Sequence, residues 1–145
     1  MTTAGEYEPS PWEHVADQVR LYESTGGAEG REVQGTPCVI LTSTGRRTGK
    51  LRKAPLIRVE HDGRYAVVAS IGGAPTHPVW YFNLLANPDV TLQDGAEVSH
   101  LRAREVEGEE KATWWARATE VWPPYDEYQA KTDRVIPLLV LEPPG

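Results

Sequence analysis

The chain has 145 residues, of which 39% are hydrophobic and 25% charged, a composition typical of a single globular domain. Its 15 Lys and Arg against 21 Asp and Glu give a formal charge of -6, which argues against a nucleic-acid-binding protein. Neither an apolar run long enough to span a bilayer nor a secretory signal is present, so we expect a cytoplasmic protein and leave peripheral membrane contact open. The single cysteine, Cys38, excludes an internal disulfide and a multi-thiolate zinc site and is expected to serve in packing.

The N-terminal region divides into an arm and a helix. Residues 1–10 are polar and aperiodic, which predicts a mobile arm, and one domain is expected over residues 11–145. The helix is predicted to start with Ser10 as its cap and Pro11 at its first position, and the glycine at position 26 ends it. Its apolar stripe is narrow, so this helix should lie across a larger unit.

The remainder of the chain predicts short strands separated by turns. The predicted strands are Thr36–Thr42, Ala54–Val59, Arg64–Ser70, Val90–Gln93, Val98–Val106 and Val135–Leu141. Helices are predicted over Pro78–Ala86 and Glu109–Val121, with a short third one carrying Tyr125 and Tyr128. Because the elements do not alternate as βαβ units, we predict a mainly β (α+β) fold, an antiparallel sheet or barrel decorated by three to four helices.

Positive charge gathers in the middle of this acidic chain. Residues 33–59 contain six cations and no acid, although proportional sharing would place about four acids there. The six cations are Arg46, Arg47, Lys50, Arg52, Lys53 and Arg58. A positive centre inside a negative exterior favours a small phosphate or carboxylate ligand over a long nucleic acid.

The densest part of this region is Thr42–Lys53, TSTGRRTGKLRK. Gly45 and Gly49 are expected to expose backbone N–H groups, and the hydroxyls and arginines beside them can bind phosphate oxygens. The spacing is not that of a Walker A loop, because only three residues separate the two glycines and Leu51 follows Lys50. The alternative interpretation is a solvated hairpin whose arginines face water.

A second candidate feature follows the strand that ends at Ala69 and Ser70. Paired glycines come next, and they would let a flat ligand approach main-chain N–H and C=O groups closely. Trp80 and Asn83 share one face of the following helix, so an indole and an amide could point toward that ligand. The alternative for Trp80 is a purely structural role in the hydrophobic core.

A third feature is the aromatic block near the C-terminus, which contains Trp122, Tyr125 and Tyr128. Two phenols three residues apart could close over an aromatic substrate and deliver a proton. The preceding Trp114 and Trp115 are interpreted as core residues. The sequence shows no metal-ligand spacing, no G-x-S-x-G elbow and no Cys with an evident His partner, which favours a protein whose chemistry comes from a redox cofactor.

Three ordered blocks carry a resemblance to a known family: LTSTGRRTGKLRKAPL, VVASIGGAPTHPVWYFNLLANPDV and WPPYDEYQAKTDRVIPLLVLEP. Over roughly residues 35–143 the chain resembles the deazaflavin (coenzyme F420)-dependent nitroreductases and F420H2-dependent quinone reductases of actinobacteria. The resemblance implies a split β-barrel related to FMN-binding flavin reductases. It also implies an enzyme that passes hydride from F420H2 to a quinone, nitroaromatic or similar activated acceptor, acting as a monomer or homodimer.

The site residues that the resemblance implies fall into two groups. Cofactor contacts are implied for Arg46, Arg47, Thr48, Gly49, Arg52, Ala69, Ser70, Pro78, Val79, Trp80 and Asn83. The acceptor pocket is implied for Trp122, Tyr125 and Tyr128, with the two tyrosines positioning the acceptor or donating a proton. Trp122 stands where relatives commonly have a tyrosine. Two alternatives stay open: an FMN-dependent oxidoreductase of the same barrel, and a non-catalytic F420 carrier or sensor.

Overall fold

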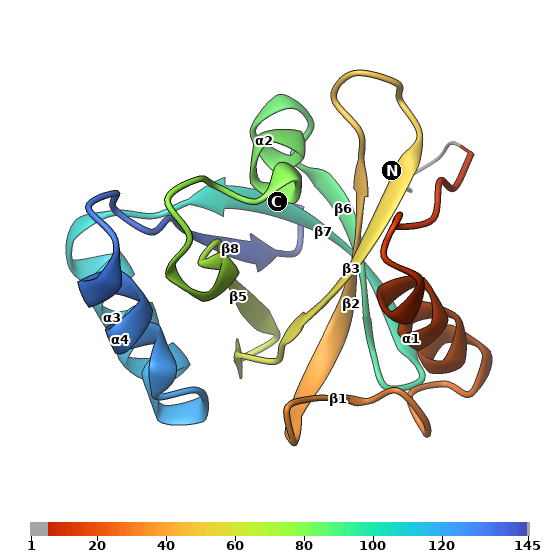
Figure 1. The fold of residues 1–145 in the computed structure, drawn as a ribbon, viewed down its shortest axis with the longest axis horizontal. Coiled ribbons are helices and arrows are strands. Elements are labelled where there is room, and N and C mark those ends of the chain that lie inside the picture. Colours follow the sequence, from red (N-terminus) through yellow and green to blue (C-terminus); the bar gives the residue numbers. More distant parts are fainter. Residues whose placement is uncertain (1–5, 145) are drawn as a thin grey trace.

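The computed structural model describes residues 6–144, in which the strands form a curled antiparallel sheet (Figure 1). The strands are β1 (Glu32–Val33), β2 (Thr36–Thr44), β3 (Leu51–Ile57), β4 (Glu60–His61), β5 (Arg64–Val68), β6 (Asp89–Asp94), β7 (Glu97–Glu105) and β8 (Leu138–Glu142). Their order is β1-β2-β6-β7-β8-β5-β4, and β3 pairs with β2. The predicted mainly β architecture with antiparallel pairing is confirmed.

The helices lie around the sheet at separate places. They are α1 (Glu13–Ser24), α2 (Val79–Ala86), α3 (Gly108–Val121) and α4 (Pro124–Lys131), with a 3-10 turn η1 (Ile71–Gly73). Helix α1 packs beside β3, α2 packs on β2 and β7, and α3 contacts β5 and β8 at the opposite side of the molecule (Figure 1). Among the helices within residues 6–144, none is both long and apolar enough to cross a bilayer.

Strand β2 is buried on both of its faces, which explains its continuous apolar run. Val39 and Leu41 point into the inner core of the curled sheet. Cys38 and Ile40 point outward and pack against Val19 and Tyr22 of α1. The Cys38 thiol is buried, which raises its pKa to about 11, so the expected packing role is confirmed.

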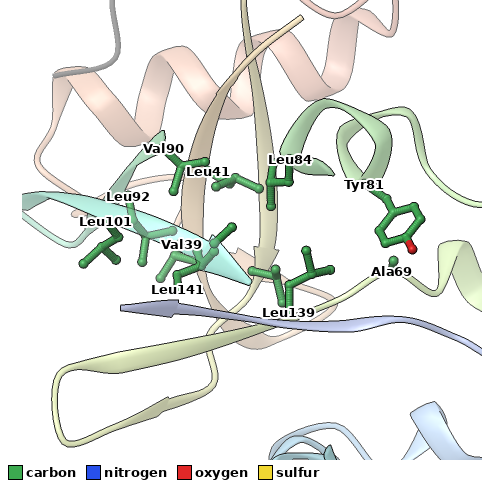
Figure 2. Close-up of a cluster of buried hydrophobic side chains, with 12 residues drawn as sticks. Val39, Leu41, Ala69, Tyr81, Leu84, Val90, Leu92, Leu101, Leu139 and Leu141 are labelled. Carbon is green, nitrogen blue, oxygen red and sulfur yellow. The ribbon is translucent and has the colours of Figure 1, made fainter. Parts of the chain in front are cut away.

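The inner core holds α2 against the sheet (Figure 2). The strands contribute Val39, Leu41, Val90, Leu92, Leu101, Leu139 and Leu141, and α2 contributes Tyr81 and Leu84. Burying each large side chain stabilises the fold by about 1.5 to 3 kcal/mol. Trp80 of α2 also packs against this core, and Trp80 and Asn83 both line a cavity beside the helix.

A second core attaches α3 and α4 to the outer face of β8. Leu138 and Val140 of β8 pack with Trp114 and Ala118 of α3 and with Tyr125 of α4. The structure thus assigns Trp114 to the core, as predicted. The same packing brings the late aromatic block to the end of β5.

Each of the six predicted strands differs from the structure at one or both ends, and β1 and β4 were not predicted. Two of these differences have a plain physical reason. Strand β3 starts at Leu51, earlier than the predicted Ala54, because Thr44 pairs with Leu51 and extends the hairpin. The turn is therefore confined to the residues between these two. The last strand starts at Leu138, later than the predicted Val135, because Pro137 lacks a backbone donor and its carbonyl oxygen accepts from the Ala69 amide.

The N-terminal region also differs from the prediction. Helix α1 starts at Glu13, and the Ser10 hydroxyl accepts from the Trp12 amide at 3.1 Å, outside the helix. A mobile arm was expected up to residue 10, yet residues 6–8 lie along β3, where Glu6 O and Glu8 N bond to the Leu51 backbone. Backbone pairing requires no side-chain periodicity, so the sequence pattern could not show it. The first five residues of the predicted arm lie outside the described residues.

Candidate functional site

Three adjoining cavities are lined by residues of β3, α2 and the segments around them. We call them the cation end, of about 370 Å³, the middle, of about 320 Å³, and the aromatic end, of about 250 Å³. The middle shares Arg52, Val79 and Asn83 with the cation end. It shares Trp80 with the aromatic end, so the three cavities adjoin in a row, which we call the groove.

The groove brings together most of the site residues proposed from the sequence. Arg46, Arg47, Thr48, Arg52, Val79 and Asn83 line the cation end. Ser70, Pro78, Trp80, Trp122, Tyr125 and Tyr128 line the aromatic end. Gly49 and Ala69 line none of the three cavities: Gly49 shapes the turn with a φ of +74°, and Ala69 is fully buried in the inner core.

The turn that forms the cation end is held by its own backbone. The Gly45 amide donates to Lys50 O at 2.7 Å, and the Gly49 amide donates to Gly45 O at 2.9 Å. The Lys50 amide donates to the Thr48 hydroxyl at 3.2 Å. The sequence predicted free N–H groups at both glycines, and this was wrong because the turn closes on itself. The Gly45 and Gly49 amides are therefore not available to an anion at this end.

The arginines of the turn are exposed and charged. Neither Arg46 nor Arg47 forms an ion pair with an acid among residues 6–144. The Arg46 guanidinium lies 4.9 Å from the centre of the Phe82 ring, and Arg52 Nη1 lies 3.3 Å from Glu8 Oε2. The cation end therefore presents two guanidinium groups whose charge no acid of the described chain neutralises.

Asn83 connects α2 to the turn. Its side chain is only 2% exposed, and its Oδ1 accepts from the Arg46 amide at 3.1 Å. The sequence placed this amide toward a ligand. In the structure its oxygen fixes the turn to the helix, while the residue still lines the cation end and the middle.

The aromatic end contains two phenols in different surroundings. Tyr125 is 5% exposed, and burial, together with the nearby Tyr128, raises the pKa of its phenol well above the ordinary value. The half-buried Tyr128 ring meets Tyr125 edge-on, with ring centres 6.1 Å apart. A phenol with a raised pKa stays protonated, so Tyr125 can donate a hydrogen bond to a bound molecule.

The backbone beside the aromatic end is more occupied than the sequence indicated. The Ala69 and Ser70 amides donate to Pro137 O and Val68 O, both at 2.9 Å. The carbonyl oxygens of Ala69 and Ser70 accept from Arg134. We expected these groups to be free to read the edge of a ring, and for the amides that was wrong. Sequence reasoning missed Arg134 because its partners lie about 60 residues earlier.

Other lining residues were also missed. The segment before α1 adds Ser10, Pro11 and Trp12 to the middle, and β3 adds Lys53 there. Lys53 belongs to the cation run, so its charge was a usable signal. Trp12 carried no such signal, because it comes to line the same cavity as Trp80 only through the tertiary fold.

The curled sheet with its decorating helices defines the class of protein as a split β-barrel. A solved protein of the pyridoxinephosphate oxidase family from Clostridium acetobutylicum shares this fold. It aligns with a TM-score of 0.52 at 16% identity, covering 88% of this chain and 85% of its own. At that identity the likeness shows the fold alone.

The chain belongs to the F420H(2)-dependent quinone reductase family, whose model matches residues 14–143. It is 35% identical over 125 residues to an F420H(2)-dependent quinone reductase of Mycobacterium tuberculosis, covering 83% of this chain and 84% of the relative. A solved F420-H2-dependent reductase is 56% identical, with a TM-score of 0.70 over 73% of this chain and 94% of its own. A solved structure described as a domain-swapped dimer is 50% identical to this chain, with a TM-score of 0.73, and the match covers 92% of this chain and 100% of that one. The resemblance seen in the sequence is confirmed, and membership implies coenzyme F420 as the cofactor.

Proposed function

We propose that the protein is an F420H2-dependent reductase that transfers hydride to a quinone, a nitroaromatic or a similarly activated acceptor. One observation carries this proposal: the groove has exposed arginines, which form no ion pair within residues 6–144, at one end and a pocket lined by aromatic side chains at the other. F420 has an anionic phosphorylated arm and a flat ring system, which match these two ends. The family membership supports the same cofactor.

The residues present fit this cofactor. Arg46, Arg47 and Arg52 would hold the phosphorylated arm, because guanidinium groups bind phosphate oxygens through paired, charge-assisted hydrogen bonds. Trp80 and Ser70 would limit the position of the ring at the other end. Binding at two separated ends fixes orientation, and orientation is the main contribution a protein makes to a hydride transfer.

The acceptor would lie against the aromatic end. When bound, F420H2 supplies a hydride, which delivers two electrons in one step. Trp122, Tyr125 and Tyr128 exclude water and present an apolar surface on which a flat acceptor can pack. Tyr125 stays protonated because of its raised pKa and donates a hydrogen bond to an acceptor oxygen. The less buried Tyr128 or solvent supplies the proton.

The test compares three cofactors on the purified full-length protein. F420, FMN and NADPH are titrated separately by fluorescence, and we expect saturable binding of F420 alone. Reduced F420 is then mixed anaerobically with a naphthoquinone or a nitrobenzene, and its reoxidation is followed by absorbance. Reoxidation that depends on both protein and acceptor supports the proposal.

Two results would contradict it. A yellow protein with an FMN spectrum, or preferential FMN binding, assigns the groove to a flavin. Tight F420 binding without reduction of any acceptor in a broad panel assigns a carrier or sensor role.

The proposal includes a small-molecule partner, no nucleic acid, and a monomer or homodimer. Salt-dependent binding of duplex DNA to the protein would contradict the absence of a nucleic-acid partner. Size-exclusion chromatography with light scattering decides between the two assembly states.

A further inference from the structure

Arg134 follows α4 and reaches back to the segment after β5. Its guanidinium donates to the carbonyl oxygens of Ser70 at 2.7 Å, Ala74 at 2.8 Å and Ala69 at 3.1 Å. Arg134 forms no ion pair with an acid among residues 6–144. Its charge is used to hold backbone carbonyls in place, through hydrogen bonds stronger than those of a neutral donor.

A fourth acceptor of Arg134 is the imidazole of His77. The Nδ1 atom of His77 lies 2.8 Å from Nη1 of Arg134. Burial, and then the charge of Arg134, lower the pKa of His77. A neutral imidazole can accept at Nδ1, as this contact requires. The guanidinium therefore connects both ends of the segment from Ala69 to His77.

This segment contains a strained residue. Ile71 has a φ of +41°, a left-handed conformation that β-branched side chains rarely adopt. Its side chain is 51% exposed and lines the aromatic end next to Ser70. Such strain persists only where surrounding contacts hold the backbone, and the carbonyl immediately before Ile71 is one that Arg134 holds.

The same segment contacts the helix that carries the two tyrosines. Gly73 packs so closely on α4 that an added Cβ would lie 2.8 Å from Tyr128 O. Gln129 of α4 donates to the carbonyl oxygen of Arg134 at 2.8 Å and accepts from the Ile136 amide at 2.9 Å. Both walls of the aromatic end, the Ser70 wall and the Tyr125 and Tyr128 wall, thus meet at Arg134.

We propose that Arg134 is a positioning residue that sets the spacing between the two walls of the aromatic end and so determines how the cofactor ring is held. It lines none of the three cavities of the groove, so it acts through the Ala69–His77 segment. The inference rests on the proposed function. It predicts that ring binding and arm binding respond separately to changes at this residue.

The experiment uses the full-length variants Arg134→Met and Arg134→Lys, with Arg117→Met as a matched control. Methionine removes the charge and all donors, whereas lysine keeps the charge but lacks the planar fork that serves several acceptors. Arg117 lies on α3 with its guanidinium 4.6 Å from the Trp114 ring centre, away from this segment. Three quantities are measured: F420 affinity by fluorescence, the induced circular dichroism of the bound chromophore, and affinity for inorganic pyrophosphate as a probe of the cation end.

We expect both Arg134 variants to bind F420 at least tenfold more weakly and to change the induced dichroism, while pyrophosphate affinity stays within twofold. His77→Ala removes one of the four acceptors and should show a smaller change of the same kind. Thermal unfolding identifies a variant that does not fold. If Arg134→Met does not fold, the two separate variants His77→Ala and Arg134→Lys test the role of Arg134.

Two results would overturn the inference. One is wild-type F420 affinity and dichroism in folded Arg134 variants, and the other is an equal loss of F420 and pyrophosphate binding. If the wild-type protein binds pyrophosphate but not F420, the proposed function fails instead, so the two failures are distinguishable.

Discussion

The two ends of the groove are built in opposite ways. The cations of the cation end come from one hairpin, and Arg46 and Arg47 keep their charge exposed and unpaired within the described chain. The aromatic end draws on residues as far apart as Val33 and Tyr128, and its nearby cation, Arg134, is fully engaged with backbone carbonyls and an imidazole. From this difference we expect the hairpin to contribute most of the affinity for F420 and the aromatic end to set the orientation of its ring.

Removing the charge of the hairpin should have the largest effect. We expect Arg46→Ala with Arg47→Ala to weaken F420 binding by about 2 to 4 kcal/mol, or about 30-fold to 1,000-fold, because charge-assisted hydrogen bonds to phosphate are lost. Fluorescence titration measures the change. The control pair Arg31→Ala with Arg102→Ala removes the same charge from exposed positions outside the groove. Equal losses in both pairs would mean that only the overall charge matters.

A change at the contact between η1 and α4 should disturb the opposite end. Gly73 has a φ of +84°, and a Cβ there would clash with the Tyr128 backbone, so we expect Gly73→Ala to lower the Tm by about 6 to 12 °C and reduce turnover. Gly63→Ala is the matched control, since Gly63 has a φ of +78° and open space around its Cβ position. Its Tm should fall by about 3 to 6 °C, with turnover retained. Equal behaviour of the two variants would contradict a close contact at Gly73.

The phenol of Tyr125 should affect turnover more than affinity. Tyr125→Phe keeps the ring that packs in the second core, and the lost hydrogen bond should lower kcat by about 2-fold to 10-fold, with F420 affinity within twofold.

The pH dependence gives a second check on Tyr125. Because the pKa of the Tyr125 phenol is raised above 10, the phenol stays protonated and the wild-type rate should show no Tyr125 ionisation between about pH 6 and pH 9. Steady-state kinetics over that range checks both points, with Tyr65→Phe as control. If kcat is unchanged, Tyr125 is structural.

The smallest expected change is a gain in affinity at the cation end. The Glu8 carboxylate lines this cavity and pairs with Arg52, so it competes with an incoming anion. An exposed pair of this kind contributes about 0.2 to 1 kcal/mol, and Glu8→Gln should therefore tighten F420 binding by about 1.5-fold to 5-fold. Glu6→Gln, on the same segment but with its carboxylate outside the cavity, should leave affinity unchanged. Weaker binding in Glu8→Gln would show that the carboxylate assists the cofactor.

Most strands and helices were predictable because each has a local pattern. Helix α2 stops where Asn87 and Pro88 end it, and the apolar run of β8 reflects burial on both faces. The ends of the strands were predicted less accurately, since a strand extends as far as its partner strand pairs with it. Thr44 and Leu51 pair across the hairpin although neither belonged to a predicted strand.

The candidate site was predicted in part, for a related reason. Five of the six cations lie within the twelve residues Thr42–Lys53, so charge counting identified Arg46, Arg47 and Arg52. The roles of backbone groups were predicted less well. The Gly45 amide and the Ala69 carbonyl both have partners that the sequence order conceals.

The sequence by itself determined the order of strands and helices, the location of the positive charge, and the motifs that mark the family, because each of these is written in neighbouring residues. Only the tertiary structure decided that Trp12 joins Trp80 in the groove, that Asn83 anchors the cationic turn, and that Arg134 links the two walls of the aromatic pocket. The paired residues lie 37 to 68 positions apart in the sequence. Such pairs come together only when the sheet curls, and the local sequence pattern around each residue does not specify its distant partner.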